Sequence, residues 1–188
     1  MKKDRNMYKI IIIVIIILVY YILLPEGYYE FYRSFPVYPD SYKEVKLVEK
    51  YMSERNERDI EFFRITNKDM NLVFKEVVNE PLDYINYLIE EPKFLIIFLK
   101  NIINRIRPKQ INPRLKLLDA EGTADTPAYP AGHALQAYYV AKKLKFKYPE
   151  KEEILDKIAR ECDITRIKAG LHYPSDGQFS KYIVDKFL

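Results

Sequence analysis

The sequence has little of what would place it in several protein classes. Its 188 residues include one cysteine, Cys162, so the chain can form neither an intramolecular disulfide nor a cysteine-rich metal site. Hydrophobic residues make up 48% and charged residues 31%, which excludes an intrinsically disordered chain and a collagen-like repeat. Cys162 stands in a helical pattern that favours a buried small hydrophobe. The length suits one domain with a sizeable core.

The excess of positive charge is small and lies at one end. The formal net charge is +4, but four of the 31 basic and one of the 27 acidic side chains precede residue 25. The rest of the chain therefore holds 27 basic and 26 acidic side chains. Because the basicity belongs to an N-terminal tail and not to a domain surface, we expect no nucleic-acid partner.

An apolar run without a charge occupies residues 10–24. It is shorter than the roughly 20 residues that cross a bilayer, but Lys9 can snorkel, and Tyr20 and Tyr21 suit the interface. A cleaved signal peptide would need small residues near the end of the run, and a buried strand would be about half as long. We therefore expect an uncleaved single-pass membrane anchor, with basic residues 1–9 in the cytoplasm and the domain extracytoplasmic or lumenal.

Beyond the apolar run, residues 25–40 are rich in proline and aromatic side chains and predict an ordered arm. Residues 41–188 follow as one domain with helical spacing of apolar side chains and no alternating strand pattern. The expected fold class is all-α, a helical bundle without internal repeats. The predicted helices run from Ser41, from Asn67 to Asn79, through Leu82 to Ile89, from Pro92 up to Pro108, from Ala134 to Leu144, from Ile154 to Cys162 and from Phe179 to Phe187.

Two cations stand in the apolar helix that begins at Pro92. Lys100 and Arg107 are seven residues apart, so a continuous helix would present both on one face among Phe, Leu and Ile. Cations are costly there unless they meet an anion, and an arginine fork with a lysine point charge suits a phosphoryl group. The alternative is a solvated helix end with snorkelling basic side chains. The loop that follows, from Pro108 to Pro130, is long enough to suggest a functional role.

The chain has two histidines, and His133 is the first. It follows Gly132, which allows close backbone approach, at a loop-to-helix boundary. The free N–H groups and the dipole of a helix N-terminus favour an anion at such a place. A plain turn with a capping histidine would give the same pattern.

The second histidine, His172, lies six residues after Arg166 and four before Asp176. Gly170 and Pro174 predict a helix break that would let Arg166 and His172 face one pocket. If the chain becomes helical again at Pro174, Asp176 can hold one ring nitrogen and leave the other free as a nucleophile. A surface His–Asp pair is the alternative.

Together the three patterns resemble the type 2 phosphatidic acid phosphatase (PAP2) and vanadium haloperoxidase superfamily. They are Lys-x6-Arg-Pro from Lys100, Pro-x-Gly-His from Pro130 and Arg-x5-His-x3-Asp from Arg166, in that order. Two positions depart from the family pattern. Ala131 stands where the family usually has serine, which removes one hydroxyl contact to phosphate, and Thr165 replaces a serine but keeps a hydroxyl.

The resemblance implies a metal-independent phosphatase that works through a phosphohistidine, with no cofactor. His172 would attack phosphorus, Asp176 would orient its ring, and His133 would protonate the leaving oxygen and later activate water. The phosphate oxygens would be held by Lys100, Arg107, Arg166 and the backbone N–H of Gly132. The sequence has no cluster of His, Cys or paired carboxylates at metal-ligand spacing beyond these residues.

The resemblance leaves the substrate class open between soluble phosphate monoesters and lipid phosphates in the adjoining membrane. A vanadate-dependent haloperoxidase, with vanadate as prosthetic group in the same pocket, is an alternative, although known members of that branch are much longer chains. A non-catalytic phosphate- or lipid-binding protein is the other, made plausible by Ala131.

Overall fold

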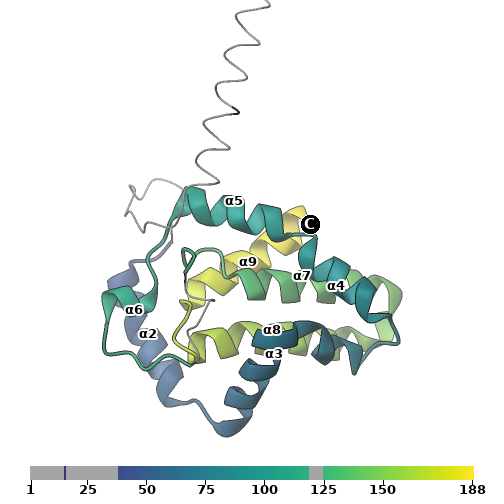
Figure 1. The fold of residues 1–188 in the computed structure, drawn as a ribbon, viewed down its shortest axis with the longest axis horizontal. Coiled ribbons are helices and arrows are strands. Elements are labelled where there is room, and N and C mark those ends of the chain that lie inside the picture. Colours follow the sequence, from purple (N-terminus) through teal and green to yellow (C-terminus); the bar gives the residue numbers. More distant parts are fainter. Residues whose placement is uncertain (1–14, 16–37, 119–124) are drawn as a thin grey trace, which may run out of the picture.

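The computed structural model describes residues 15, 38–118 and 125–188, and the described part of the chain is an all-helical bundle without strands (Figure 1). The expected all-α class is therefore confirmed. The elements are α2 (Ser41–Ser53), α3 (Glu57–Lys75), α4 (Leu82–Glu90), α5 (Lys93–Ile103), α6 (Pro108–Ile111), α7 (Gly132–Lys147), the 3₁₀ helix η1 (Pro149–Lys151), α8 (Glu152–Lys168) and α9 (Pro174–Phe187).

The predicted tail 1–9, and the predicted anchor 10–24 and arm 25–40 apart from residues 15 and 38–40, lie outside the described residues. Within the described ranges, no helix combines the length and the apolar character needed to span a membrane.

Helix α7 lies at the centre of the bundle and packs against α8, α9, α4 and α5. Its small side chains Ala134, Ala137 and Ala141 are buried, which lets the neighbouring helices approach closely. The same packing holds the N-terminus of α7 against α5, so the predicted site residues of these two helices meet at one end of the core.

Helix α5 ends earlier than the sequence predicted. We expected it to run to Pro108, but Asn104 adopts a left-handed conformation (φ 50°, ψ 47°) and its N–H donates to the carbonyl of Lys100 at 2.8 Å. Asparagine tolerates positive φ better than most residues and commonly ends a helix in this way. The expectation that Lys100 and Arg107 share a helical face is therefore wrong: Arg107 lies beyond α5, in extended backbone at the start of α6.

Helix α3 begins ten residues before its predicted start at Asn67. A reciprocal cap at its N-terminus joins the side chain of Asn56 to the N–H of Asp59, and the carboxylate of Asp59 to the N–H of Asn56. The backbone of Asp69 is non-helical (φ −145°, ψ 80°) and kinks the helix two residues after Asn67. The predicted break between α8 and α9 is confirmed, with Gly170 at φ 80°.

Candidate active site

The seven predicted site residues come from five parts of the fold, and the structure brings them to one end of the bundle. They are Lys100 near the end of α5, Arg107 just before α6, Gly132 and His133 in the first turn of α7, Arg166 near the end of α8, and His172 and Asp176 on either side of the start of α9.

His172 and Asp176 form a buried pair. Nδ1 of His172 lies 3.1 Å from Oδ2 of Asp176, and the N–H of Tyr173 donates to the same oxygen at 2.9 Å. A carboxylate opposite Nδ1 favours the tautomer that carries its proton there. The lone pair of the neutral ring then lies on Nε2, the nitrogen beside Arg107.

Arg107 holds the Nε2 side of this ring. Its Nη1 lies 3.2 Å from Nε2 of His172 and donates to the carbonyl of Leu171 at 2.8 Å. Its Nε donates to the carbonyl of Thr126 at 2.8 Å. Carbonyls of two loops therefore fix the guanidinium plane beside the histidine, which is the geometry that planar recognition of an oxyanion needs.

Arg166 is buried but incompletely paired. Its Nη1 donates to Oδ1 of Asn67 at 2.5 Å, and its guanidinium carbon lies 4.6 Å from the ring centroid of Phe63. Within the described part of the chain, Nε and Nη2 of Arg166 are buried and have no hydrogen-bond partner. A buried guanidinium with two unused donors is costly unless an acceptor occupies the space in front of it.

Lys100 and the N-terminus of α7 are neighbours. The ammonium of Lys100 donates to the carbonyl of Pro127, and a Cβ added to Gly132 would lie 3.6 Å from Cε of Lys100 and 3.3 Å from Cγ2 of Ile96. A side chain at Gly132 would therefore crowd the approach of the first turn of α7 to α5. His133 follows in that turn and is half-buried.

The cluster is electrostatically positive. Burial lowers the pKa of His172 well below its usual value, and the charges of Arg107, Lys100 and Arg166 lower it further. Burial also lowers the pKa of His133, and nearby charges lower it further, in the order Arg166, His172, Lys100 and Arg107. The pKa of Lys100 is also lowered, by burial and by Arg107, and that of Arg166 falls to about 10 through burial. An anion in this space would relieve the mutual repulsion of these groups.

The sequence did not reveal Arg105, which is fully buried behind Asp176. Its Nη1 donates to Oδ1 of Asp176 at 2.6 Å and to the hydroxyl of Ser175 at 2.7 Å, and its Nη2 donates to Glu44 at 2.7 Å. The predicted helix to Pro108 hid this residue, because in a helix positions 105 and 107 point to different sides. Outside the helix, both side chains reach the His172–Asp176 pair.

The arrangement combines a buried imidazole, whose Nε2 lies beside Arg107, with a second imidazole and three cations. Such a site can bind a tetrahedral oxyanion and offer it a nitrogen nucleophile and a proton donor. Among the residues that the structure describes, no group of three or more His, Cys, Asp or Glu side chains is placed to hold a metal ion.

No protein-family model and no curated protein matches the chain. A solved structure does: the first transmembrane PAP2-type phosphatidylglycerolphosphate phosphatase from Bacillus subtilis. The match has a TM-score of 0.52 and 19% sequence identity, and it covers 77% of this chain and 84% of that one. The bundle described above therefore has the PAP2 fold.

Proposed function

We propose that the chain is a PAP2-type phosphatase that hydrolyses phosphate monoesters through a phosphohistidine on His172, without a metal ion. The observation that carries the proposal is the unused, buried hydrogen-bonding capacity of Arg166, which faces a site already containing Lys100 and Arg107. A phosphate dianion offers the oxygens and the charge that this group of donors lacks.

In the first step, Nε2 of His172 attacks phosphorus, and the bond from phosphorus to the leaving oxygen breaks. His133 donates its ring proton to that oxygen, so the leaving group departs as a neutral alcohol. The ring of His172 becomes cationic while it carries the phosphoryl group, and the carboxylate of Asp176 on Nδ1 stabilises that charge.

In the second step, His133, now neutral, takes a proton from water as the water oxygen attacks phosphorus. The N–P bond breaks, inorganic phosphate leaves, and both rings return to their starting states. In both steps the cations of Lys100, Arg107 and Arg166 stabilise charge that spreads over the equatorial oxygens of the phosphoryl group.

The proposed substrate is a phosphorylated small molecule or a lipid phosphate. The PAP2 fold and the lipid phosphate in the name of the Bacillus subtilis protein support the second source. The apolar run 10–24 supports a membrane location, with the N-terminus cytoplasmic and the catalytic domain outside or in a lumen.

The test is phosphate release from p-nitrophenyl phosphate by the full-length chain in detergent, together with acid-free quenching to trap the phosphoenzyme. We expect turnover by the wild type and a phosphoryl group on nitrogen that is lost in acid and stable in base. His172→Ala should abolish both signals. Exposed Tyr87→Ala, on α4, is a control that should retain both. Turnover by folded His172→Ala at the wild-type rate would refute the mechanism.

A binding protein without turnover is the second candidate, because Ala131 places a buried methyl group at the N-cap of α7 where the family has a hydroxyl. Under that function, vanadate or phosphate would bind with micromolar affinity while none of the esters tested is hydrolysed. Ester hydrolysis that depends on His172 excludes it.

A further inference from the structure

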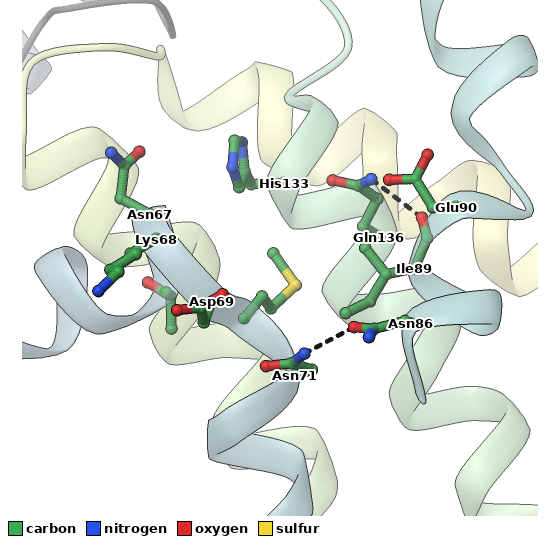
Figure 2. A pocket seen from close by; sticks show the side chains of 11 residues that line it. Asn67, Lys68, Asp69, Asn71, Asn86, Ile89, Glu90, His133 and Gln136 are labelled. Carbon is green, nitrogen blue, oxygen red and sulfur yellow. Dashed lines mark hydrogen bonds between the residues drawn. The ribbon is translucent and has the colours of Figure 1, made fainter. Parts of the chain in front are cut away.

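A pocket of about 240 Å³ lies between α3, α4 and the start of α7, and His133 is one of its lining residues. Figure 2 shows Asn67 and Lys68 on one side of it and Asn86, Glu90 and Gln136 on the other, with His133 between them. The non-helical backbone at Asp69 kinks α3 along one wall of the pocket.

The pocket is lined by polar side chains. Of the eleven lining residues, two have apolar side chains: Ile89 and the thioether Met70. Four carry amides and three carry charges. Sites for hydrocarbon groups are lined mainly by apolar side chains, and burying amides or charges against an acyl chain would leave them without partners. The lining therefore fits a ligand that carries its own hydrogen-bonding groups.

The amides are held in place but not fully used. Nδ2 of Asn71 donates to Oδ1 of Asn86 at 2.6 Å, which joins α3 to α4 across the pocket, and Nε2 of Gln136 donates to the carbonyl of Ile89 at 2.9 Å (Figure 2). Oδ1 of Asn71 is buried and has no donor within the described part of the chain. A ligand hydroxyl in the pocket can donate to or accept from the amides that line it.

The pocket adjoins the proposed phosphate site through two residues, Asn67 and His133. Asn67 lines the pocket and also accepts the hydrogen bond from Arg166. His133 forms part of the pocket wall, and in the proposed reaction this residue protonates the leaving oxygen. Since that oxygen must lie within reach of His133, the rest of the leaving alcohol extends into this pocket.

We propose that this pocket binds the leaving alcohol of the substrate, and that this alcohol is a small polyol, of glycerol to hexose size. The inference rests on the proposed function and adds the substrate class to it. The volume is below the roughly 300–1,000 Å³ of pockets for drug-sized ligands. The polyol can belong to a free polyol phosphate or to a lipid headgroup that ends in a phosphorylated glycerol.

The test compares two esters with the same three-carbon skeleton, glycerol 3-phosphate and propyl phosphate, on the full-length chain in detergent. We expect a higher kcat/KM for glycerol 3-phosphate in the wild type. Asn86→Leu and Asn71→Leu should lower the ratio of the two kcat/KM values about tenfold, mainly through KM of the polyol ester, with propyl phosphate changed less than twofold. Asn86 is exposed, so its replacement leaves the core intact.

Asn79→Leu is the matched control, because Asn79 is exposed after α3 and does not line the pocket. It should leave the ratio unchanged. A third ester, phosphatidylglycerol phosphate in mixed micelles, identifies the source of the polyol. If the polyol belongs to a lipid headgroup, this ester should have a higher kcat/KM than glycerol 3-phosphate and the same sensitivity to Asn86→Leu. If the substrate is a free polyol phosphate, glycerol 3-phosphate should have the higher kcat/KM. Equal or higher kcat/KM for propyl phosphate, or an unchanged ratio in both variants, overturns the proposal.

Failure of the proposed function is a separate outcome. If the wild type releases phosphate from none of the esters, the proposed phosphatase activity is refuted. Calorimetric titration of glycerol 3-phosphate and propyl phosphate into the wild type then tests whether the pocket binds a polyol. Tighter binding of glycerol 3-phosphate that is lost in Asn86→Leu would support a polyol-binding pocket. Equal binding of both esters would refute it.

Discussion

The carboxylate of Asp176 lies between His172 and Arg105, with one oxygen 3.1 Å from Nδ1 of the histidine and the other 2.6 Å from Nη1 of the arginine. Arg105 is fixed in turn by Glu44 at 2.7 Å and by the ring of Tyr173, whose centroid lies 3.9 Å from the guanidinium carbon. Burial raises the pKa of Asp176, and the charge of Arg105 opposes that effect. Arg105 therefore acts as a positioning residue: its charge opposes protonation of the carboxylate, and its hydrogen bond aims the carboxylate at the histidine.

Replacing Arg105 by Lys keeps the charge and removes the fork. We expect kcat to fall roughly 10- to 100-fold with KM changed less than threefold, because a single ammonium cannot hold Asp176 and Glu44 in their present positions. Arg105→Met should also lower the free energy of unfolding by about 3–5 kcal/mol, since it leaves buried carboxylates unpaired. Steady-state kinetics and urea unfolding measure the two effects. Arg114→Lys, at an exposed position, is the control. An equal fall in kcat in this variant would show that Arg105 has no special role.

The pH dependence of kcat/KM should have its maximum on the acid side. Burial and the neighbouring cations lower the pKa of both histidines below the ordinary value of about 6.5. His172 is then neutral and nucleophilic down to acidic pH, whereas His133 loses its proton as the pH rises through its lowered pKa. For an alkyl phosphate, kcat/KM should fall about tenfold per pH unit on the alkaline side.

An ester with a good leaving group supplies the control for this profile. p-Nitrophenyl phosphate needs little proton donation, so its kcat/KM should decline less steeply over the same pH range. A kcat/KM for alkyl phosphates that rises steadily through alkaline pH would contradict the role assigned to His133.

Vanadate should inhibit the phosphatase competitively, and EDTA should leave activity unchanged. Vanadate adopts five-coordinate geometry with an imidazole as axial ligand and so resembles the phosphoryl group in transit, which a complementary site binds more tightly than phosphate. Inhibition constants for vanadate and phosphate at one pH measure the difference. Activity that EDTA abolishes and magnesium or zinc restores would show a metal-dependent mechanism, and halide oxidation with peroxide and vanadate would show a haloperoxidase.

Ala131→Ser restores the hydroxyl that the family carries at this position. Ala131 is the N-cap of α7 and makes no side-chain capping bond, so the added hydroxyl should raise the free energy of unfolding by about 1 kcal/mol. A further hydrogen bond to the bound phosphoryl group should raise kcat/KM about tenfold. Thermal unfolding and ester kinetics measure the two effects, with Ala131→Val as a control that adds volume and no hydroxyl. Lower kcat/KM in the serine variant would show that the site has no room for this contact.

Asp163 should make stability depend on pH. It is buried on α8, accepts a hydrogen bond from Tyr138 at 3.1 Å, and burial raises its pKa to about 7. Since the folded state holds this proton more tightly than the unfolded state, its contribution is present at low pH and is lost as the pH rises from about 4 to about 7. The loss amounts to about 1.4 kcal/mol per unit of pKa shift.

Urea unfolding of the wild type and Asp163→Asn at pH 5 and pH 8 isolates this group, because the amide does not titrate. The stability of the wild type relative to the variant should decrease at the higher pH. An equal difference at both values of pH would show that Asp163 is ionised throughout.

The third motif predicted the pairing of His172 with Asp176 because it joins these groups over a few residues of chain. His172 and Asp176 lie one helical turn apart, and the break at Gly170 follows from the glycine itself. The partners of Arg166 could not be predicted in this way. Asn67 is 99 residues away and reaches Arg166 through the packing of α3 on α8, for which the sequence carries no local signal.

The helix boundaries were also predicted where local sequence determines them and missed where the surrounding structure does. Apolar periodicity predicted the start of α2 and both ends of α4 and α7 within a few residues, whereas α8 continues six residues beyond its predicted end at Cys162. The early end of α5 was missed because the conformation of Asn104 depends on the surrounding structure and the periodicity continues past it. That error concealed the role of Arg105.

The short segment that joins α5 to α6 should tolerate insertions and deletions only in steps of two residues. Arg105 contacts Asp176 and Arg107, which has extended backbone, contacts His172; the two side chains thus reach one His–Asp pair at the two-residue spacing by which side chains alternate in a strand. Adding or removing one residue between them would turn one guanidinium away from the His–Asp pair, whereas a change of two residues would restore its direction. Among homologous chains, length variation at this point should therefore occur in even steps or be absent.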